Sequence, residues 1–195
     1  MFAMKCHILA MGCNGHILMM CGDDAVFVTE GWDDALRSVH KKWPDGIWCA
    51  SMWDGTTGKP EEYDTKENDK GEMVKIPLEG TKYKITHPHP AIGRDAFEAL
   101  GYLTNPMFNH FCTDPWITDM FQDLDRFMYF PEVRVDHMRA GSVVGCVEDD
   151  TYRKMRPNGK CHFSERDRTV YGMFRKYQDL DIEILKLKIK EYEHV

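Results

Sequence analysis

Short apolar runs alternate with amphipathic segments along most of the chain, and this alternation limits the folds that it can adopt. Residues 17–21 and 47–53 have the length of buried strands and are bounded by turn-forming residues. Between them, residues 31–43 place apolar side chains at helical spacing and run into a Pro-Asp-Gly turn signal. Strands that alternate with helices indicate the α/β class, here a mixed sheet flanked by helices.

The rest of the chain extends this pattern with further expected elements. They are helices at 3–11, 94–101 and 114–125, a strand at 82–87, and two short strands within 126–138 hinged at Pro131. Residues 54–80 are rich in Gly, Lys, Glu, Asp and Thr and predict a long surface loop. Helix-like spacing in the tail predicts a C-terminal helical extension over 165–195, after a domain that covers 1–164.

Composition narrows the classes of protein to consider. With 195 residues, of which 43% are hydrophobic, the chain can bury one good core. A net charge of −7 argues against a broad nucleic-acid surface or an anionic-membrane surface. Seven cysteines without a CxxC pair indicate a reducing compartment. The first residues are too short and too interrupted for a signal peptide or a membrane span, so we expect a soluble cytoplasmic protein.

Two adjacent carboxylates follow the first predicted strand. Asp23 and Asp24 repel each other unless water, a cation or hydrogen-bond donors compensate their charges. Carboxylates at a strand end can hold Mg²⁺ or Mn²⁺, although one Asp could instead cap the turn while the other is solvated. His137 ends the alternating strand that carries Val133 and Val135 on the same face. It is either an inward core histidine or a metal ligand.

Two further segments carry side chains that could take part in chemistry. Asp114 precedes Pro115, so it is expected to be a helix N-cap, and a carboxylate at a helix mouth could also act as a general base. Asp119 is expected to face solvent or to pair with Arg126. Arg94 opens a helix and could hold an anionic or hydroxylated ligand. The prolines of the HPHP segment make simultaneous metal ligation by its two histidines, His87 and His89, awkward.

The order of these motifs carries a family resemblance. The motifs follow one another in an order that resembles family 2 glycosyltransferases, most closely the phage and bacterial glycosyltransferase-like proteins. In chain order they are GDD, FVTEGWDDAL, HPAIGRDAFEALGYL, TDPWITDMF and VRVDHM. The resemblance covers residues 14 to about 152 and implies a GT-A fold. It assigns Asp23 and Asp24 to the donor nucleotide, Asp24 and His137 to a divalent cation, and Asp114 to the base role. The acceptor side would include Arg94, Phe97, Tyr102 and the stacking face of Trp116.

One departure from the family is also visible. Only 22 residues precede Asp23, so the chain resembles a member without the N-terminal nucleotide-binding half. The resemblance implies a metal-dependent, inverting transfer of a sugar from a nucleotide-sugar donor to a hydroxyl of a glycan or another acceptor. Two alternatives stay open. One is a non-catalytic module that binds a glycan or a partner, and the other is a metal-dependent hydrolase built on Asp23, Asp24, His137 and His87. A parallel sheet buries both of its faces, so loss of the N-terminal half would leave an edge or a face of the sheet uncovered. We expect that surface to be closed by a second copy or by the C-terminal helix.

Overall fold

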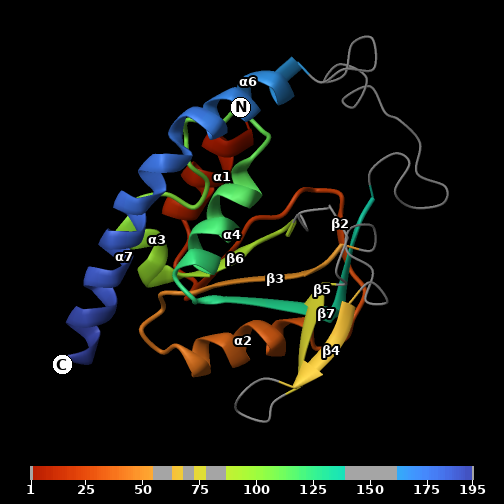
Figure 1. The fold of residues 1–195 in the computed structure, drawn as a ribbon. Coiled ribbons are helices and arrows are strands. Elements are labelled where there is room, and N and C mark those ends of the chain that lie inside the picture. Colours follow the sequence, from red (N-terminus) through yellow and green to blue (C-terminus); the bar gives the residue numbers. More distant parts are fainter. Residues whose placement is uncertain (1, 55–62, 68–72, 78–86, 139–161, 195) are drawn as a thin grey trace.

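A curled, five-stranded mixed sheet lies at the centre of the molecule (Figure 1). The computed structural model describes residues 2–54, 63–67, 73–77, 87–138 and 162–194. The strand order is β1 (Ile17–Met19), β6 (Ala91–Gly93), β3 (Cys49–Trp53), β7 (Phe127–His137) and β2 (Ala25–Phe27). The β3–β7 pair is parallel, whereas β1–β6, β6–β3 and β7–β2 are antiparallel. The predicted mixed α/β class is therefore confirmed.

Helices cover both faces of this sheet, and β3 supplies side chains to both. On one face, α2 (Trp32–Lys42) contributes Leu36 and Val39 to a core that includes Ala50 and Met52 of β3. On the other face, Cys49 of β3 joins a second core. The helices around that second core are α1 (Phe2–Met11), α3 (Arg94–Leu100), α4 (Thr113–Asp123) and the C-terminal α7 (Gln178–Glu193). This division follows from the strand geometry, in which successive side chains point to opposite faces.

The predicted C-terminal helical tail is confirmed. It consists of α6 (His162–Phe174), the 3₁₀ turn η3 (Arg175–Tyr177) and α7, which together run as a bent rod along one side of the molecule (Figure 1). α7 packs on α3 and α4, and it buries Ile182 and Leu185 in the second core. The tail therefore closes the helical layer above the sheet, which is one of the two coverings expected.

Several strands differ from the prediction. β7 is one strand rather than two, with a shift in its pairing to β3 next to Pro131, where the missing N–H interrupts the ladder. β2 and β6 were not predicted. The expected loop at 54–80 contains an antiparallel hairpin, β4 (Tyr63–Glu67) and β5 (Met73–Pro77), so a structureless loop is wrong there. The predicted strand at 82–87 lies almost entirely outside the described residues. Within the described part of the chain, every helix is too short or too polar to serve as a bilayer span.

Candidate functional site

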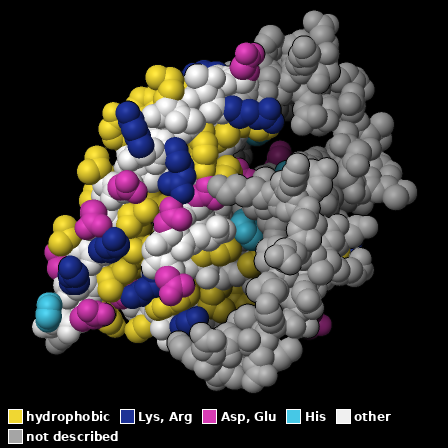
Figure 2. Space-filling view, viewed as in Figure 1, with side chains coloured by type: hydrophobic (Ala, Val, Ile, Leu, Met, Phe, Trp, Pro, Cys, Tyr) yellow, Lys and Arg dark blue, Asp and Glu magenta, His cyan; other side chains and the backbone are white. Residues whose placement is uncertain are grey.

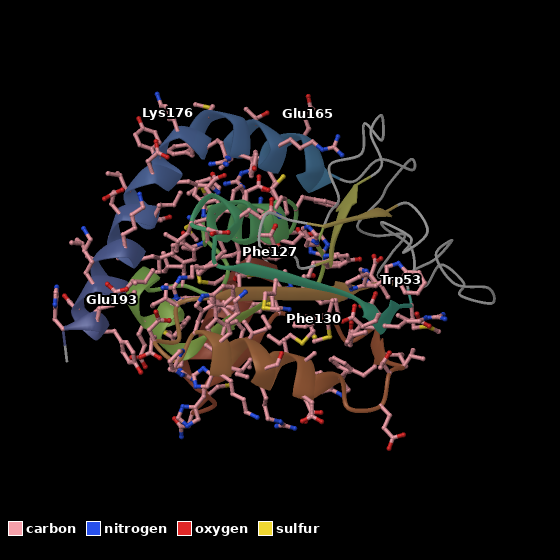
Figure 3. The ribbon with its side chains drawn as sticks, turned by 60° about the horizontal axis from the view of Figure 1, so that its bottom comes forward. Trp53, Phe127, Phe130, Glu165, Lys176 and Glu193 are labelled. Atoms are coloured by element: carbon pink, nitrogen blue, oxygen red, sulfur yellow. The ribbon has the colours of Figure 1, made fainter. Side chains whose placement is uncertain are left out.

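Four side chains converge where several strands end, and we call Asp24, Asp54, His89 and His137 the strand-end cluster. Parallel β3 and β7 finish at the same edge of the sheet, and Asp54 directly follows β3 while His137 ends β7. β2 begins one residue after Asp24 and runs antiparallel to β7, with Ala25 opposite His137. This register is the local reason why Asp24 lies beside His137. In Figure 3, Trp53 marks this end of β3, and Phe127 marks the opposite end of β7.

The carboxylate of Asp24 and the imidazole of His137 are in direct contact. The distance from Asp24 Oδ2 to His137 Nε2 is 3.0 Å, and both side chains are partly exposed. Two backbone bonds hold this pair in place: Met138 N–H donates to Asp24 O at 2.8 Å, and His137 N–H donates to Asp54 O at 3.4 Å. The predicted proximity of Asp24 and His137 is confirmed. Asp23, in contrast, is exposed in the turn between β1 and β2.

His89 and Asp54 form the buried side of the cluster. The His89 ring centroid lies 4.9 Å from that of His137, and both His89 and Asp54 are less than a tenth exposed. Burial lowers the pKa of His89, and nearby His137 lowers it further, while the carboxylates of Asp54 and Asp24 oppose this shift. Its Nε2 atom has no hydrogen-bond partner among the described residues. The neutral imidazole therefore offers a buried nitrogen next to the Asp24–His137 pair.

The two histidines of the HPHP segment do not share a site. The His87 ring contacts Phe127 and Tyr129, with centroids 4.7 Å and 4.8 Å away. Burial lowers the pKa of His87 to about 4, so this side chain is neutral at neutral pH. Only His89 contacts His137 within this segment, which agrees with the expectation that joint ligation by the two histidines is awkward.

The Asp24–His137 pair has a suitable geometry for a divalent cation. Two ligands about 2.1 Å from one ion, at about 90° to each other, lie about 3 Å apart; the 3.0 Å between Asp24 and His137 equals this spacing and is also that of a direct hydrogen bond. Within the described residues, no group of three or more His, Cys, Asp or Glu side chains has metal-site geometry. The described residues thus offer two adjacent candidate ligands and not a complete protein-lined metal site.

Asp114 lies in the first turn of α4, the helix that packs on β3 and β7. The predicted N-cap role of Asp114 is wrong, because the N-cap is Cys112 in a left-handed conformation (φ 62°). Trp116 N–H donates to Cys112 O at 3.1 Å, so the first helical bond begins two residues earlier than expected. The half-buried Asp114 carboxylate stays at the positive end of the helix dipole, which favours its ionised form.

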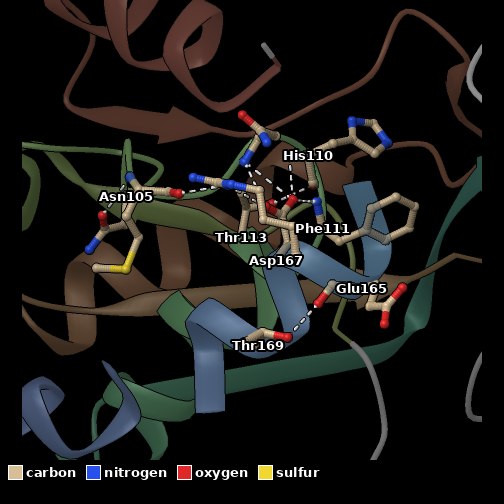
Figure 4. Close-up of polar contacts among 10 residues, drawn as sticks. Asn105, His110, Phe111, Thr113, Glu165, Asp167 and Thr169 are labelled. Atoms are coloured by element: carbon tan, nitrogen blue, oxygen red, sulfur yellow. Dashed lines mark hydrogen bonds and ion pairs between the residues drawn. The ribbon is translucent and has the colours of Figure 1, made fainter. Parts of the chain in front are cut away.

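The segment that leads into α4 is fixed by a carboxylate from the C-terminal tail (Figure 4). Asp167 of α6 is fully buried and accepts the backbone N–H groups of Asn109, His110 and Phe111, at 2.9–3.2 Å. Burial alone would raise the pKa of Asp167, but these three donors and Arg166 lower it below its ordinary value. No sequence motif pointed to Asp167, because its partners are backbone groups that lie far away in the chain.

Asp119, on the same helix as Asp114, is not where the sequence placed it. It is buried, accepts a hydrogen bond from Tyr171 and has Arg175 Nε 3.9 Å away. Arg126 pairs instead with Asp45, at 2.8 Å. The expected exposure of Asp119 and its pairing with Arg126 are therefore wrong, because the C-terminal helices cover this side of α4.

The residues expected on the acceptor side serve the structure in other ways. Arg94 donates to the backbone carbonyls of Gly15 and Cys13, at 2.9 Å and 2.6 Å, and so holds the loop before β1. Trp116 is buried and donates to the Tyr102 hydroxyl at 3.0 Å, which in turn donates to Asp181 at 2.5 Å. Neither aromatic ring offers an exposed face to an acceptor. Acceptor binding by these residues stays a prediction.

Comparisons with family models, curated proteins and solved structures find no match to this chain. The functional argument therefore rests on the motifs and on the geometry described above. Sequence reasoning had singled out Asp24 and His137, and the structure adds Asp54 and His89 to them. The signal for Asp54 was its position directly after a predicted strand.

Proposed function

We propose that this chain is a metal-dependent glycosyltransferase-like protein that transfers a sugar from a nucleotide-sugar donor to an acceptor hydroxyl with inversion. The proposal is supported above all by the 3.0 Å contact between Asp24 and His137. The family resemblance assigns these two residues to one cation, and they come from segments that are far apart in the sequence. Their contact supports the proposal more strongly than either motif alone, because the fold had to bring the two segments together.

In this proposal each residue has a defined role. Asp24 and His137 would hold Mn²⁺ or Mg²⁺, which when bound would neutralise the charge that develops on the departing nucleoside diphosphate. The exposed Asp23 would accept hydrogen bonds from the donor ribose. Asp114 would take the proton of the acceptor hydroxyl, which is a poor nucleophile until a base removes that proton. The helix dipole keeps the Asp114 carboxylate ionised and ready for this transfer.

The first test is metal binding. Calorimetric titration of the full chain with Mn²⁺ should show one binding site. Asp24→Asn and His137→Gln should each lower the affinity of that site for Mn²⁺ at least tenfold. Asp33→Asn is a matched control, because Asp33 is also a carboxylate near β2 but pairs with Arg37 on the exposed face of α2. Thermal melts of each variant without metal separate lost binding from lost folding. A wild-type chain that binds no Mn²⁺, alone or with a nucleoside diphosphate, would overturn the metal site.

The second test is turnover. Incubation with Mn²⁺, a panel of nucleotide sugars and simple hydroxyl acceptors should release nucleoside diphosphate together with a glycosylated acceptor. Donor binding without any release would favour the non-catalytic module instead. Release that does not depend on an acceptor would favour the hydrolase. Both outcomes contradict the proposed transfer while leaving the metal site intact, so the two tests report on different parts of the proposal.

A further inference from the structure

The backbone around His89 is held in a conformation that few residues adopt. His89 stands between two prolines and has a φ of 54°, in the left-handed region. A residue other than glycine is strained there and keeps this conformation only where its surroundings enforce it. Ser51 Oγ donates to Pro88 O at 2.8 Å, and Met20 N–H donates to Pro90 O at 2.9 Å. These bonds fix the chain on both sides of His89, so the fold itself places the imidazole ring.

Met20 also determines which nitrogen of the His89 ring carries the proton. Burial lowers the pKa of His89, and a hydrogen bond with the backbone of Met20 partly offsets this shift. A bond that raises the pKa of a histidine is one in which the ring donates, here to the Met20 carbonyl. Nε2 has no partner among the described residues, so the donor is Nδ1–H. The ring is therefore neutral, with a bare lone pair on Nε2.

This lone pair has the properties of a metal ligand. His89 is 7% exposed, and a buried acceptor without a donor is unfavourable, so its place in the structure needs an explanation. An imidazole that donates from Nδ1 to a backbone carbonyl is a usual form of a metal-bound histidine. Two imidazoles that bind one ion through Nε2 at about 2.1 Å have ring centroids roughly 4.5–5.2 Å apart. The centroids of His89 and His137 are 4.9 Å apart. Edge-to-face packing allows the same spacing, but it gives the lone pair no partner.

Gly22 makes room for the carboxylate of the same cluster. A Cβ atom added at Gly22 would overlap Asp24 Oδ1, whereas Asp24 Oδ2 is the atom that contacts His137. Any side chain at position 22 would therefore displace the carboxylate. Because the Asp24 side chain is partly exposed, it can move with little effect on the rest of the fold. A substitution at Gly22 thus tests the position of Asp24 without removing a ligand atom.

We propose that His89 Nε2 is a third ligand of the cation that Asp24 and His137 would hold, so that the site prefers a transition-metal ion to Mg²⁺. This inference rests on the proposed function. In the described structure Asp24 and His137 contact each other directly, and the three groups are not arranged as a complete metal site. Metal ligands bind deprotonated, so the proton in the Asp24–His137 contact would be lost on cation binding. Two imidazoles suit a transition-metal ion, whereas Mg²⁺ prefers oxygen ligands, and of the two ions named above they favour Mn²⁺.

NMR of the ring nitrogens, in the full chain labelled with ¹⁵N-histidine, tests the third ligand directly. Zn²⁺ is the probe, because it is diamagnetic and binds imidazole well. Without metal, His89 should show a protonated Nδ1 and a bare Nε2. Zn²⁺ should move the Nε2 resonances of both His89 and His137. Along the described part of the face seen in Figure 2, Lys and Arg side chains are interspersed with Asp and Glu, so it offers no concentrated negative charge to compete for the probe.

His87 is the matched control within the same segment. It is also 7% exposed, but its ring packs on Phe127 and Tyr129, so Zn²⁺ should leave its ring resonances unchanged. In calorimetric titrations, His89→Asn should weaken Zn²⁺ binding at least tenfold and change Mg²⁺ binding little. Asn is used because it tolerates the left-handed backbone. His87→Asn should leave both affinities unchanged, and Gly22→Ala should weaken both several-fold. Thermal melts without metal show whether each variant is folded.

Each result decides between the ligand set and the reaction. A shift of His137 Nε2 without one of His89 Nε2 would overturn the third ligand and leave the Asp24–His137 cation site intact. Equal losses of Zn²⁺ and Mg²⁺ affinity in His89→Asn would overturn the metal preference. A chain that binds neither Zn²⁺ nor Mn²⁺ would overturn both this inference and the proposed metal site. Binding through both histidines without any release of nucleoside diphosphate would instead overturn the proposed transfer and leave the ligand set standing.

Discussion

Asp167 shows how one carboxylate can hold together two parts of the chain. It lies in α6, is completely buried, and receives three consecutive backbone N–H groups from residues 109–111 as well as a 2.8 Å bond from Arg166. Without this carboxylate, those partly buried N–H groups would lose their acceptor. We therefore expect Asp167→Ala to lower the free energy of unfolding by about 3 kcal/mol or more, and Asp167→Asn by about 1–3 kcal/mol.

Urea unfolding at neutral pH measures these changes. Glu165→Gln is the matched control, because Glu165 lies one half-turn earlier in the same helix and is exposed. It should change the free energy of unfolding by less than about 0.5 kcal/mol. An Asp167→Asn chain as stable as the wild type would show that the backbone donors find other acceptors.

The same carboxylate predicts a pH dependence of stability. The pKa of folded Asp167 is lowered, since the backbone donors and Arg166 outweigh the effect of burial. A group whose folded pKa is depressed contributes stability above its unfolded pKa of about 3.9 and loses it as pH falls through the folded value. The difference in unfolding free energy between wild type and Asp167→Asn should therefore be constant from pH 7 to about 5 and should shrink below about pH 4. A difference that persists at pH 2 would contradict this.

Asp114 and Asp119 provide a test of the proposed base within one helix. Asp114 lies in the first turn and is partly exposed, so Asp114→Asn should lower stability by at most about 1 kcal/mol through the lost dipole interaction. The same change should abolish sugar transfer under conditions where the wild type is active. Asp119→Asn should instead lower stability, because the buried carboxylate accepts from Tyr171. Sugar transfer by Asp119→Asn, measured as product per folded molecule, should stay near the wild-type value.

Residue-level prediction from sequence succeeded where a motif named both partners. The family resemblance assigned Asp24 and His137 to one cation, so their proximity was expected, and the two side chains are in contact. The sequence did not indicate a role for Asp54, because the polar segment that follows it predicts a loop. Asp167 could not have been found, since its partners are backbone groups whose positions depend on tertiary packing.

At the scale of elements, two leucines of α7 differ sharply in how far they are buried. Leu185 is fully buried in the second core, whereas Leu187, two residues later, is 59% exposed. Leu185→Ala removes packed methyl groups and leaves a cavity, so it should cost about 2–5 kcal/mol of unfolding free energy. Leu187→Ala should change that free energy by less than about 0.5 kcal/mol, because this side chain is already exposed.

Chemical denaturation at low protein concentration measures both leucine variants. Comparable losses for the two would mean that α7 does not dock on α3 and α4 in the orientation described.

Element prediction from sequence worked for long periodic segments and failed for short ones. α2 was predicted at 31–43 and spans Trp32–Lys42, because a full amphipathic stripe and a clear stop signal defined it. β2 and β6 have three residues each, which is too short for a period-two pattern to be recognised. β4 and β5 pair with each other in a polar segment, where the hydrophobic pattern carries little information.

At the scale of the whole molecule, β3 joins the two cores. Ala50 and Met52 face the core that contains α2, whereas the preceding Cys49 points the other way, into the core that contains α4 and α7. A shift of β3 by one residue would exchange these two sets, so its register is fixed from both sides. The parallel pairing with β7 also brings Asp54 to the edge where His137 ends. The position of the candidate site therefore depends on both cores being formed.

This arrangement predicts that the two cores unfold together. Trp48 is fully buried in the α2 core, and Trp116 is 1% exposed in the core that the C-terminal helices complete. In a chain labelled with 5-fluorotryptophan, the native ¹⁹F resonances of these two residues should disappear at the same urea concentration, because shared β3 couples their surroundings. Assignment by Trp48→Phe and Trp116→Phe identifies each signal. If the Trp116 resonance were lost first while that of Trp48 stayed native, the C-terminal helices would be a separately unfolding unit, as the predicted boundary near residue 164 implies. Coincident loss would instead make the sheet, both helical layers and the strand-end cluster one cooperative structure.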